Sequence, residues 1–260
     1  MDLGLDGKRA LVLSSSRGLG LGVAQALAAE GASVMMTARS ADRLRAAAEA
    51  INVAGPGRAE TFVGDLASNV EAIHRAAVDA LGGVDILVAN TGGPPARTAL
   101  AAKPEEWTPQ FEAMVVPVIR LAGLVLPGMR ERGFGRILTI ASSGVLQPIP
   151  NLVISNALRS SLVGWSKTLA NEIAKDGVTV NVVLPGRIQT DRLEELDAAN
   201  ATAQGKSVDE IAAAARATIP AGRYGRVEEF ADVVCFLASE RASYVTGSLL
   251  RVDGGAIRSV

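Results

Sequence analysis

Seven residues near the N-terminus form a turn whose composition suits phosphate binding: Ser14-Ser15-Ser16-Arg17-Gly18-Leu19-Gly20. They follow a short apolar run and precede an alanine-rich segment that ends at Gly31. Glycine in such a turn lets the backbone approach a pyrophosphate, whose charge then lies against the N-terminus of the next helix. The glycine pair alone is weak evidence, because strand-to-helix turns often need glycine without binding a ligand. In this position it predicts a dinucleotide site contacted by Ser14, Ser16, Arg17, Gly18, Leu19 and Gly20.

The end of the second apolar run indicates which nicotinamide dinucleotide would fit. An acidic residue there would bond the ribose 2′-hydroxyl and favour NAD. This chain instead has Ala38 followed by Arg39 and Ser40. Two guanidinium groups, those of Arg17 and Arg39, favour the 2′-phosphate of NADP by charge and by bidentate geometry. The alternatives are that Arg39 only solvates a strand end and that no dinucleotide binds.

Apolar runs alternate along the chain with alanine-rich or charged segments of helical length. The runs are nearly continuous in apolar residues, as expected for strands whose two faces are both covered. The predicted strands are 9–14, 33–38, 59–66, 84–90, 135–142, 178–186 and 248–255. The order predicts an α/β fold with one domain over residues 1–260. That domain is a Rossmann-like, doubly wound parallel sheet of about seven strands with helices on both faces.

Composition excludes several classes of function. The net charge is −1 and the arginines are scattered, which argues against nucleic-acid binding. No run of 18 or more apolar residues occurs, so we expect no membrane span. Cys235 is the single cysteine, which excludes an intramolecular disulfide framework and suits a cytoplasmic location. It is expected to be buried in an apolar helix. His74 is the single histidine, so a metal site is not supported. We expect the substrate to be a small molecule.

Further motifs resemble those of the short-chain dehydrogenase/reductase family over roughly residues 7–255. The turn resembles the family's TGxxxGxG segment, with Leu13 and Ser14 replacing the Thr and the first Gly. Ser14 therefore brings a Cβ into a turn that favours glycine. The likeness is closest to ketoacyl-carrier-protein-reductase-like members, and the NTGGPP run at 90–95 resembles a divergent subgroup with incomplete catalytic motifs.

The resemblance implies further cofactor contacts in three places. Asp65 and Leu66 match the family's adenine-contacting pair, and Asn90 and Gly92 lie in the segment that matches its NNAG motif. A segment that matches PGxxxT closes over the nicotinamide carboxamide in the family. It contributes Pro185, Gly186, Ile188 and Thr190.

The resemblance also implies where the catalytic groups should lie. In the family a Tyr exchanges the proton, a Lys one helical turn later holds the ribose and lowers the Tyr pKa, a Ser orients the substrate oxygen, and an Asn anchors a relay water. The flanking sequence aligns the Ser with Ser142, the Asn with Met114, the Tyr with Ser155 and the Lys with Arg159. No tyrosine precedes Tyr224, so no shift of the alignment restores the Tyr–Lys pair.

These replacements change the proton chemistry. A serine hydroxyl is a far weaker acid than a phenol and is too short to reach the substrate oxygen without water. Arg159 keeps the positive charge but does not give up its proton. General acid–base catalysis contributes about 10²–10⁴-fold, so we expect the family's usual route to be inefficient here.

Three interpretations stay open. The first is an NADP-dependent oxidoreductase acting on a carbonyl or alcohol through Ser142, Ser155 and Arg159. The second is an isomerase, lyase or dehydratase in which Arg159 and Arg187 hold a carboxylate. The third is a non-catalytic, nucleotide-binding pseudo-enzyme, and the fold alone does not choose among them.

Each candidate catalytic side chain also has a structural alternative. Ser142 can end a strand and bond the neighbouring backbone, and Ser155 can be a helix N-terminal residue. Arg159 can belong to an internal ion pair.

The segment 191–217, rich in alanine and charge, is predicted to be a mobile helical lid over the substrate. The family resemblance also implies a homo-oligomer, a tetramer or a dimer. It would assemble through the helices at 107–131 and 153–175 and through the C-terminal region.

Overall fold

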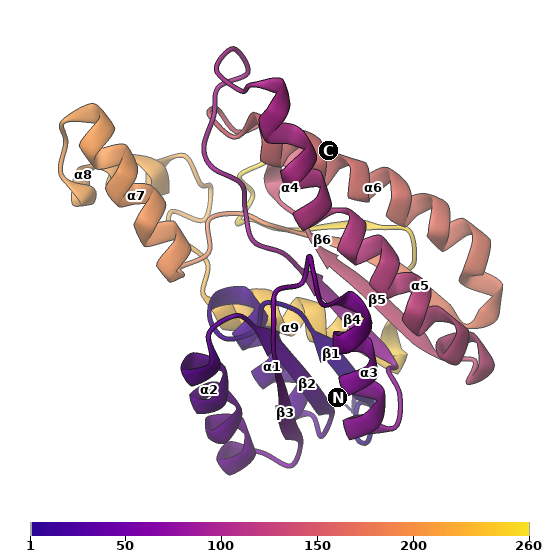
Figure 1. Cartoon of the computed structure of the whole chain (residues 1–260). Helices are drawn as coiled ribbons and strands as arrows, with labels where there is room; N and C mark the ends of the chain where they lie inside the picture. The colour runs from indigo at the N-terminus through magenta and orange to yellow at the C-terminus, as the bar shows by residue number, and fades with distance from the viewer. Residues whose placement is uncertain (1, 260) are drawn as a thin grey trace.

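Seven strands form one parallel sheet in the order β3-β2-β1-β4-β5-β6-β7 (Figure 1). This structure is a computed structural model that describes residues 2–259, so the predicted domain ends, 1 and 260, lie outside it. The strands are β1 Arg9–Val12, β2 Ser33–Ala38, β3 Arg58–Val63, β4 Ile86–Asn90, β5 Gly135–Ile140, β6 Val178–Pro185 and β7 Leu249–Val252. The predicted α/β fold is confirmed. The ends of each observed strand differ from its predicted ends by at most three residues.

Helices cover both faces of the sheet. Apolar side chains of α1 Gly18–Ala29, α2 Ala41–Ala54 and α9 Val227–Ala238 pack in a core on one face. The other face carries α3 Val70–Leu81, α4 Trp107–Met114, α5 Val116–Glu131 and α6 Val153–Ile173. Cys235 is buried in α9, as predicted, and burial raises the pKa of its thiol to about 12. It is therefore an inert packing residue.

The strand order reverses between β1 and β4, which is where ligands bind in open α/β sheets. The backbone after β1 lies beside β4, since the Leu13 N–H donates to the Val88 carbonyl at 3.0 Å. The Asn90 amide then donates to the Ser14 carbonyl at 3.4 Å. These contacts bring the glycine-rich turn and the loop after β4 together at the carboxyl edge of the sheet.

The region 104–131 is more helical than its prolines suggest. Pro109 and Pro117 lie in the first turns of α4 and α5, where a missing N–H costs little, and α5 continues through Pro127. Of the described residues, only this stretch is long and apolar enough to cross a membrane by length and composition. One face of it packs in the core through residues such as Met114 and Leu121, and core helices meet the same two criteria.

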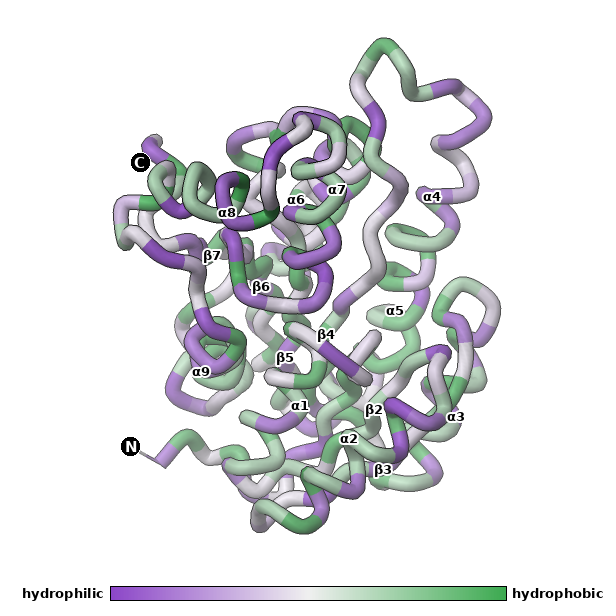
Figure 2. Tube along the Cα trace, turned by 90° about the vertical axis from the view of Figure 1, so that its left-hand side faces the viewer, coloured by the Kyte–Doolittle hydropathy of each residue, from purple (hydrophilic) through white to green (hydrophobic). Residues whose placement is uncertain are grey.

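The segment 191–217 forms two helices, α7 Asp191–Gln204 and α8 Val208–Ala217. They pack against each other and project from the body beside the carboxyl edge of the sheet (Figure 1). Hydrophilic stretches run through this region (Figure 2). The helices are nevertheless anchored, because Leu193, Ala201 and Ile211 are buried.

Candidate active site

The glycine-rich turn presents an open helix N-terminus. Helix α1 begins at Gly18, and Arg17 at the N-cap makes no side-chain capping bond. Its first turn holds no acidic residue, so the unpaired N–H groups are free to bind an anion. A Cβ on Gly20 would collide with the Ser14 carbonyl oxygen, so the tight turn requires glycine there. This geometry fits a dinucleotide pyrophosphate.

Ser14 departs from the geometry that its side chain prefers. Its φ angle is 50°, in the left-handed region that favours glycine. The expectation that this turn disfavours a Cβ is therefore confirmed. The neighbouring Ser15 is fully buried and ties the turn down, because its hydroxyl donates to the Val12 carbonyl at 2.9 Å and accepts from the Thr37 N–H at 3.0 Å.

The two arginines expected at a 2′-phosphate are exposed and ion-paired. Arg17 Nη1 lies 3.2 Å from Asp191 Oδ2 and 3.2 Å from Glu195 Oε1, both on α7. Arg39 Nη1 lies 3.7 Å from Asp65 Oδ2. Neither Asp191 nor Glu195 is among the predicted cofactor-binding residues.

The other predicted cofactor residues line the carboxyl edge of the sheet. Gly92 has open space around it, while Leu19 and Leu66 are partly buried against the cores on the two faces. The Gly186 N–H donates to the Val252 carbonyl at 2.9 Å, and Ile188 bridges to Gly225. The remaining members of this group are Ser16, Asn90, Pro185 and Thr190, which lie in or beside the loops already described.

Ser142 follows β5 and caps a short 3-10 turn, η2 Ser143–Val145. Its Oγ accepts a hydrogen bond from the Gly144 N–H at 3.1 Å. A hydroxyl has one donor and two acceptor sites, so the Ser142 O–H is free to donate to a substrate oxygen. The predicted backbone role and a substrate role are therefore compatible.

Arg159 and Ser155 lie one turn apart on the buried face of α6. The Arg159 guanidinium donates to the carbonyls of Ile140 at 3.1 Å, Thr91 at 3.2 Å and Gly92 at 3.1 Å. Burial lowers the pKa of Arg159 to about 10, so the side chain is charged at neutral pH. It ties α6 to the carboxyl ends of β4 and β5.

Within residues 2–259, one of these structural alternatives is wrong and another fits. No carboxylate lies in ion-pair contact with Arg159, so it is not part of an internal ion pair. Ser155 is the third residue of α6, after Leu152 at the N-cap, so it does lie at the N-terminus of the helix, as its structural alternative states. Met114, aligned with the family's Asn, is buried at 3 % exposure and packs in the core.

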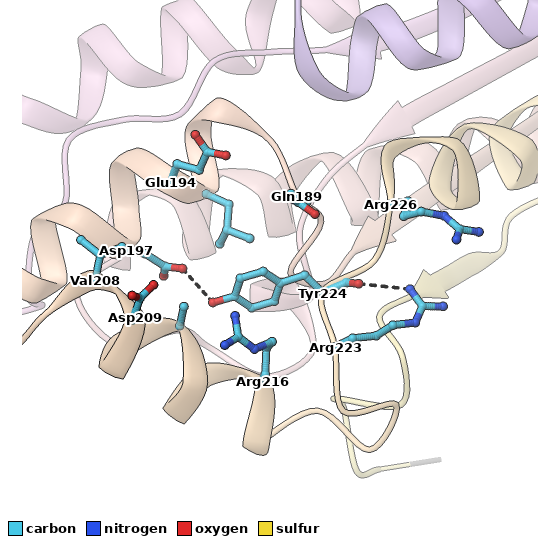
Figure 3. A pocket seen from close by; sticks show the side chains of 11 residues that line it. Gln189, Glu194, Asp197, Val208, Asp209, Arg216, Arg223, Tyr224 and Arg226 are labelled. Carbon is cyan, nitrogen blue, oxygen red and sulfur yellow. Dashed lines mark hydrogen bonds between the residues drawn. The ribbon is translucent and has the colours of Figure 1, made fainter.

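A separate cavity of about 520 Å³ lies between α7, α8 and the segment 222–226 (Figure 3). The buried Asp197 accepts hydrogen bonds from the Tyr224 hydroxyl at 2.7 Å and from Arg187 Nη1 at 3.2 Å. Burial, and then the bond to Asp197, raises the pKa of Tyr224. Asp197 therefore engages one nitrogen of Arg187, whose side chain is 41 % exposed. One signal in the sequence could have indicated that Asp197 is buried. It lies four residues from both Leu193 and Ala201, and so on the same face of the helix as these two apolar residues.

The chain matches known proteins over nearly its whole length. Residues 13–256 match the family described as enoyl-(acyl carrier protein) reductase. The chain is 38 % identical to the 3-oxoacyl-(acyl-carrier-protein) reductase FabG of Vibrio cholerae over 255 residues, covering 97 % of this chain and 98 % of that protein.

Solved structures agree with this match. The L-sorbose reductase of Gluconobacter frateurii, complexed with NADPH and L-sorbose, is 35 % identical with a TM-score of 0.94, and both chains are covered fully. A variant of the actinorhodin polyketide ketoreductase with NADPH is 33 % identical with a TM-score of 0.90, covering 97 % of this chain and 98 % of that one. With this fold and these matches, the chain belongs to the short-chain dehydrogenase/reductase family of oxidoreductases.

Proposed function

We propose that this chain is an NADP(H)-dependent oxidoreductase that interconverts a carbonyl and an alcohol without a Tyr–Lys pair. The observation that carries the proposal is the open N-terminus of α1 at the topological switch point, with the exposed side chains of Arg17 and Arg39 nearby. Two similar structures hold NADPH and belong to reductases, which supports this choice of cofactor.

The residues present fit the cofactor. The N–H groups at Gly18–Gly20 would hold the pyrophosphate, and Arg17 and Arg39 would hold the 2′-phosphate. Gly92 leaves room for backbone approach. When bound, NADPH supplies the hydride.

The protein's own groups would act on the substrate oxygen. Ser142 would donate its free O–H to that oxygen and fix its position. Arg159, bonded to the carbonyl of Ile140 two residues before Ser142, would stabilise negative charge developing there. The proton that completes the alcohol would come from bulk solvent through a water ordered by Ser155, because the Ser155 hydroxyl is too short to reach the substrate oxygen and the Arg159 guanidinium donates to backbone carbonyls.

A second candidate is a nucleotide-binding protein without redox activity, or one that uses the fold for isomerase or lyase chemistry. The observation that favours it is the engagement of Arg159 with three backbone carbonyls, which is also a purely structural arrangement. Tight NADPH binding without oxidation by any carbonyl compound would favour this candidate.

The test measures the oxidation of NADPH through the loss of its absorbance. The candidate substrates are a 3-oxoacyl thioester, L-sorbose and small ketones. Ser142→Ala is expected to lower the rate by about 10²-fold, the effect of removing one hydrogen-bond donor to a developing oxyanion. Ser160→Ala is the matched control, because its hydroxyl is exposed on α6 and bonds the Asn156 carbonyl. Equal rates for both variants would contradict the role of Ser142.

We further propose that α7 and α8 form the substrate lid of a single-domain subunit, and that the subunits assemble as a homotetramer. Exposed apolar side chains on the predicted contact elements support assembly, among them Phe111 on α4 and Ile119 on α5. The cytoplasmic location rests on composition and stays a prediction.

A further inference from the structure

One guanidinium links the phosphate-binding turn to the helical hairpin. Arg17, at the N-cap of α1, contacts two carboxylates of α7, those of Asp191 and Glu195, each at 3.2 Å. The two acids are four residues apart and so lie on one face of the helix. All three side chains are about half exposed, between 47 % and 65 %, so no packing prevents Arg17 from moving.

The backbone places the start of α7 beside this turn. Thr190 is the N-cap of α7 and accepts from the Leu193 N–H through its side chain. Its methyl carbon lies 3.7 Å from the position that a Cβ on Gly18 would take. The ion pairs between Arg17 and α7 therefore lie beside the turn that would bind a dinucleotide pyrophosphate.

Arg17 carries one positive charge and cannot satisfy every anion at once. A 2′-phosphate would compete for this guanidinium with the two α7 carboxylates, which both contact its Nη1 atom. Arg39 has its own acid, Asp65, at the longer distance of 3.7 Å. Competition at Arg17 therefore involves α7, whereas competition at Arg39 does not.

We propose that Asp191 and Glu195 are specificity-determining residues, which act by holding Arg17 away from the 2′-phosphate and so reduce the preference for NADPH over NADH. This inference rests on the proposed cofactor function. NADH has no 2′-phosphate, so it leaves the Arg17 contacts with α7 in place. Binding of NADPH exchanges them for contacts with the phosphate.

The experiment compares the dissociation constants of NADPH and NADH by calorimetry for the full chain and the Asp191→Asn/Glu195→Gln double variant. Two exposed ion pairs correspond to roughly a two- to tenfold change in affinity. We expect the variant to bind NADPH tighter by that factor and NADH within about twofold of the parent protein. Glu194→Gln is the control for general electrostatics, because it removes one negative charge, half the change of the double variant, from the same helix at a side chain that does not contact Arg17.

A double-mutant cycle that includes Arg17→Gln separates the direct contact between Arg17 and the α7 acids from the general electrostatic effect of removing negative charge. In that background the double substitution on α7 is expected to leave NADPH affinity unchanged, because the guanidinium that the acids occupy is gone. An equal gain with and without Arg17, or an equal gain from Glu194→Gln, would overturn the inference while the cofactor proposal stands. Binding of neither dinucleotide to the parent protein would overturn both.

Discussion

Among residues 2–259, two arginines, Arg136 and Arg159, are buried and bonded to backbone carbonyls, but their surroundings differ. Arg136 lies 4.2 Å over the Phe134 ring, and burial lowers its pKa while the carboxylate of Glu240 opposes that shift. For Arg159 burial alone shifts the pKa, to about 10, and no carboxylate pairs with it in the described chain. Its charge is therefore unneutralised at the edge of the sheet where ligands bind in this fold.

The pH dependence of turnover follows from these groups. Serine hydroxyls do not titrate in the ordinary range, and Arg159 loses its proton only as the pH rises through about 10. We expect the rate of carbonyl reduction to be flat between about pH 6 and 9 and to fall above about pH 10, where the positive charge is lost. An initial-rate profile at saturating NADPH checks this. A step with an apparent pKa near neutrality would show that another acid delivers the proton.

The left-handed Ser14 makes a second prediction. A Cβ in this region costs about 1–2 kcal/mol, and glycine's greater freedom in the unfolded chain offsets about half of the gain. Ser14→Gly is therefore expected to raise the free energy of unfolding by about 0.5–1 kcal/mol, as measured by denaturant unfolding. Ser16→Gly, at a residue with ordinary φ, should lower it. A destabilised Ser14→Gly would show that the serine hydroxyl compensates for the strain.

At the scale of elements, the α7–α8 hairpin depends on one buried polar contact. Asp197 is nearly inaccessible and joins α7 to Tyr224 and Arg187. A hydrogen bond to a charged group contributes more than a neutral one, so this contact fixes the hairpin to the segment 222–226. Its buried apolar side chains are Leu193, Ala201, Ile211 and Ala215.

Tyr224→Phe removes the hydroxyl and leaves a buried carboxylate with one partner fewer. We expect hydrogen exchange within 191–217 to become roughly fivefold faster, which corresponds to about 1 kcal/mol of local stability. Tyr244→Phe is the control, since Tyr244 is fully exposed and makes no hydrogen bond with the described residues. Unchanged exchange in Tyr224→Phe would show that the hairpin is held by its apolar contacts.

Much of the architecture follows from local pattern. The strands and most helices were predictable, because continuous apolar runs bounded by glycine identify a sheet covered on both faces. The partners of Arg17, Arg159 and Arg187 were not predictable. They depend on where α7 and the loop after β4 lie in space, and sequence spacing does not encode those placements. The left-handed Ser14 was anticipated only because glycine was expected at its position.

For the whole molecule, the family resemblance implies a homo-oligomer, and apolar side chains left exposed in the single chain support that prediction. Phe111 and Ile119 lie on α4 and α5, and Tyr244 and Leu249 lie near the C-terminus. We expect light scattering to give about four times the chain mass of 26.8 kDa. A mass that stays at that of one chain would refute the oligomer.

The central claim is that a dinucleotide with a 2′-phosphate occupies the site formed by the glycine-rich turn, Arg17 and Arg39. The most direct measurement is a titration of the purified protein with NADPH and with NADH, in which binding is detected by nicotinamide fluorescence or by calorimetry. The account predicts saturable binding of NADPH that is tighter than that of NADH. Absence of binding of either up to about 1 mM would contradict it.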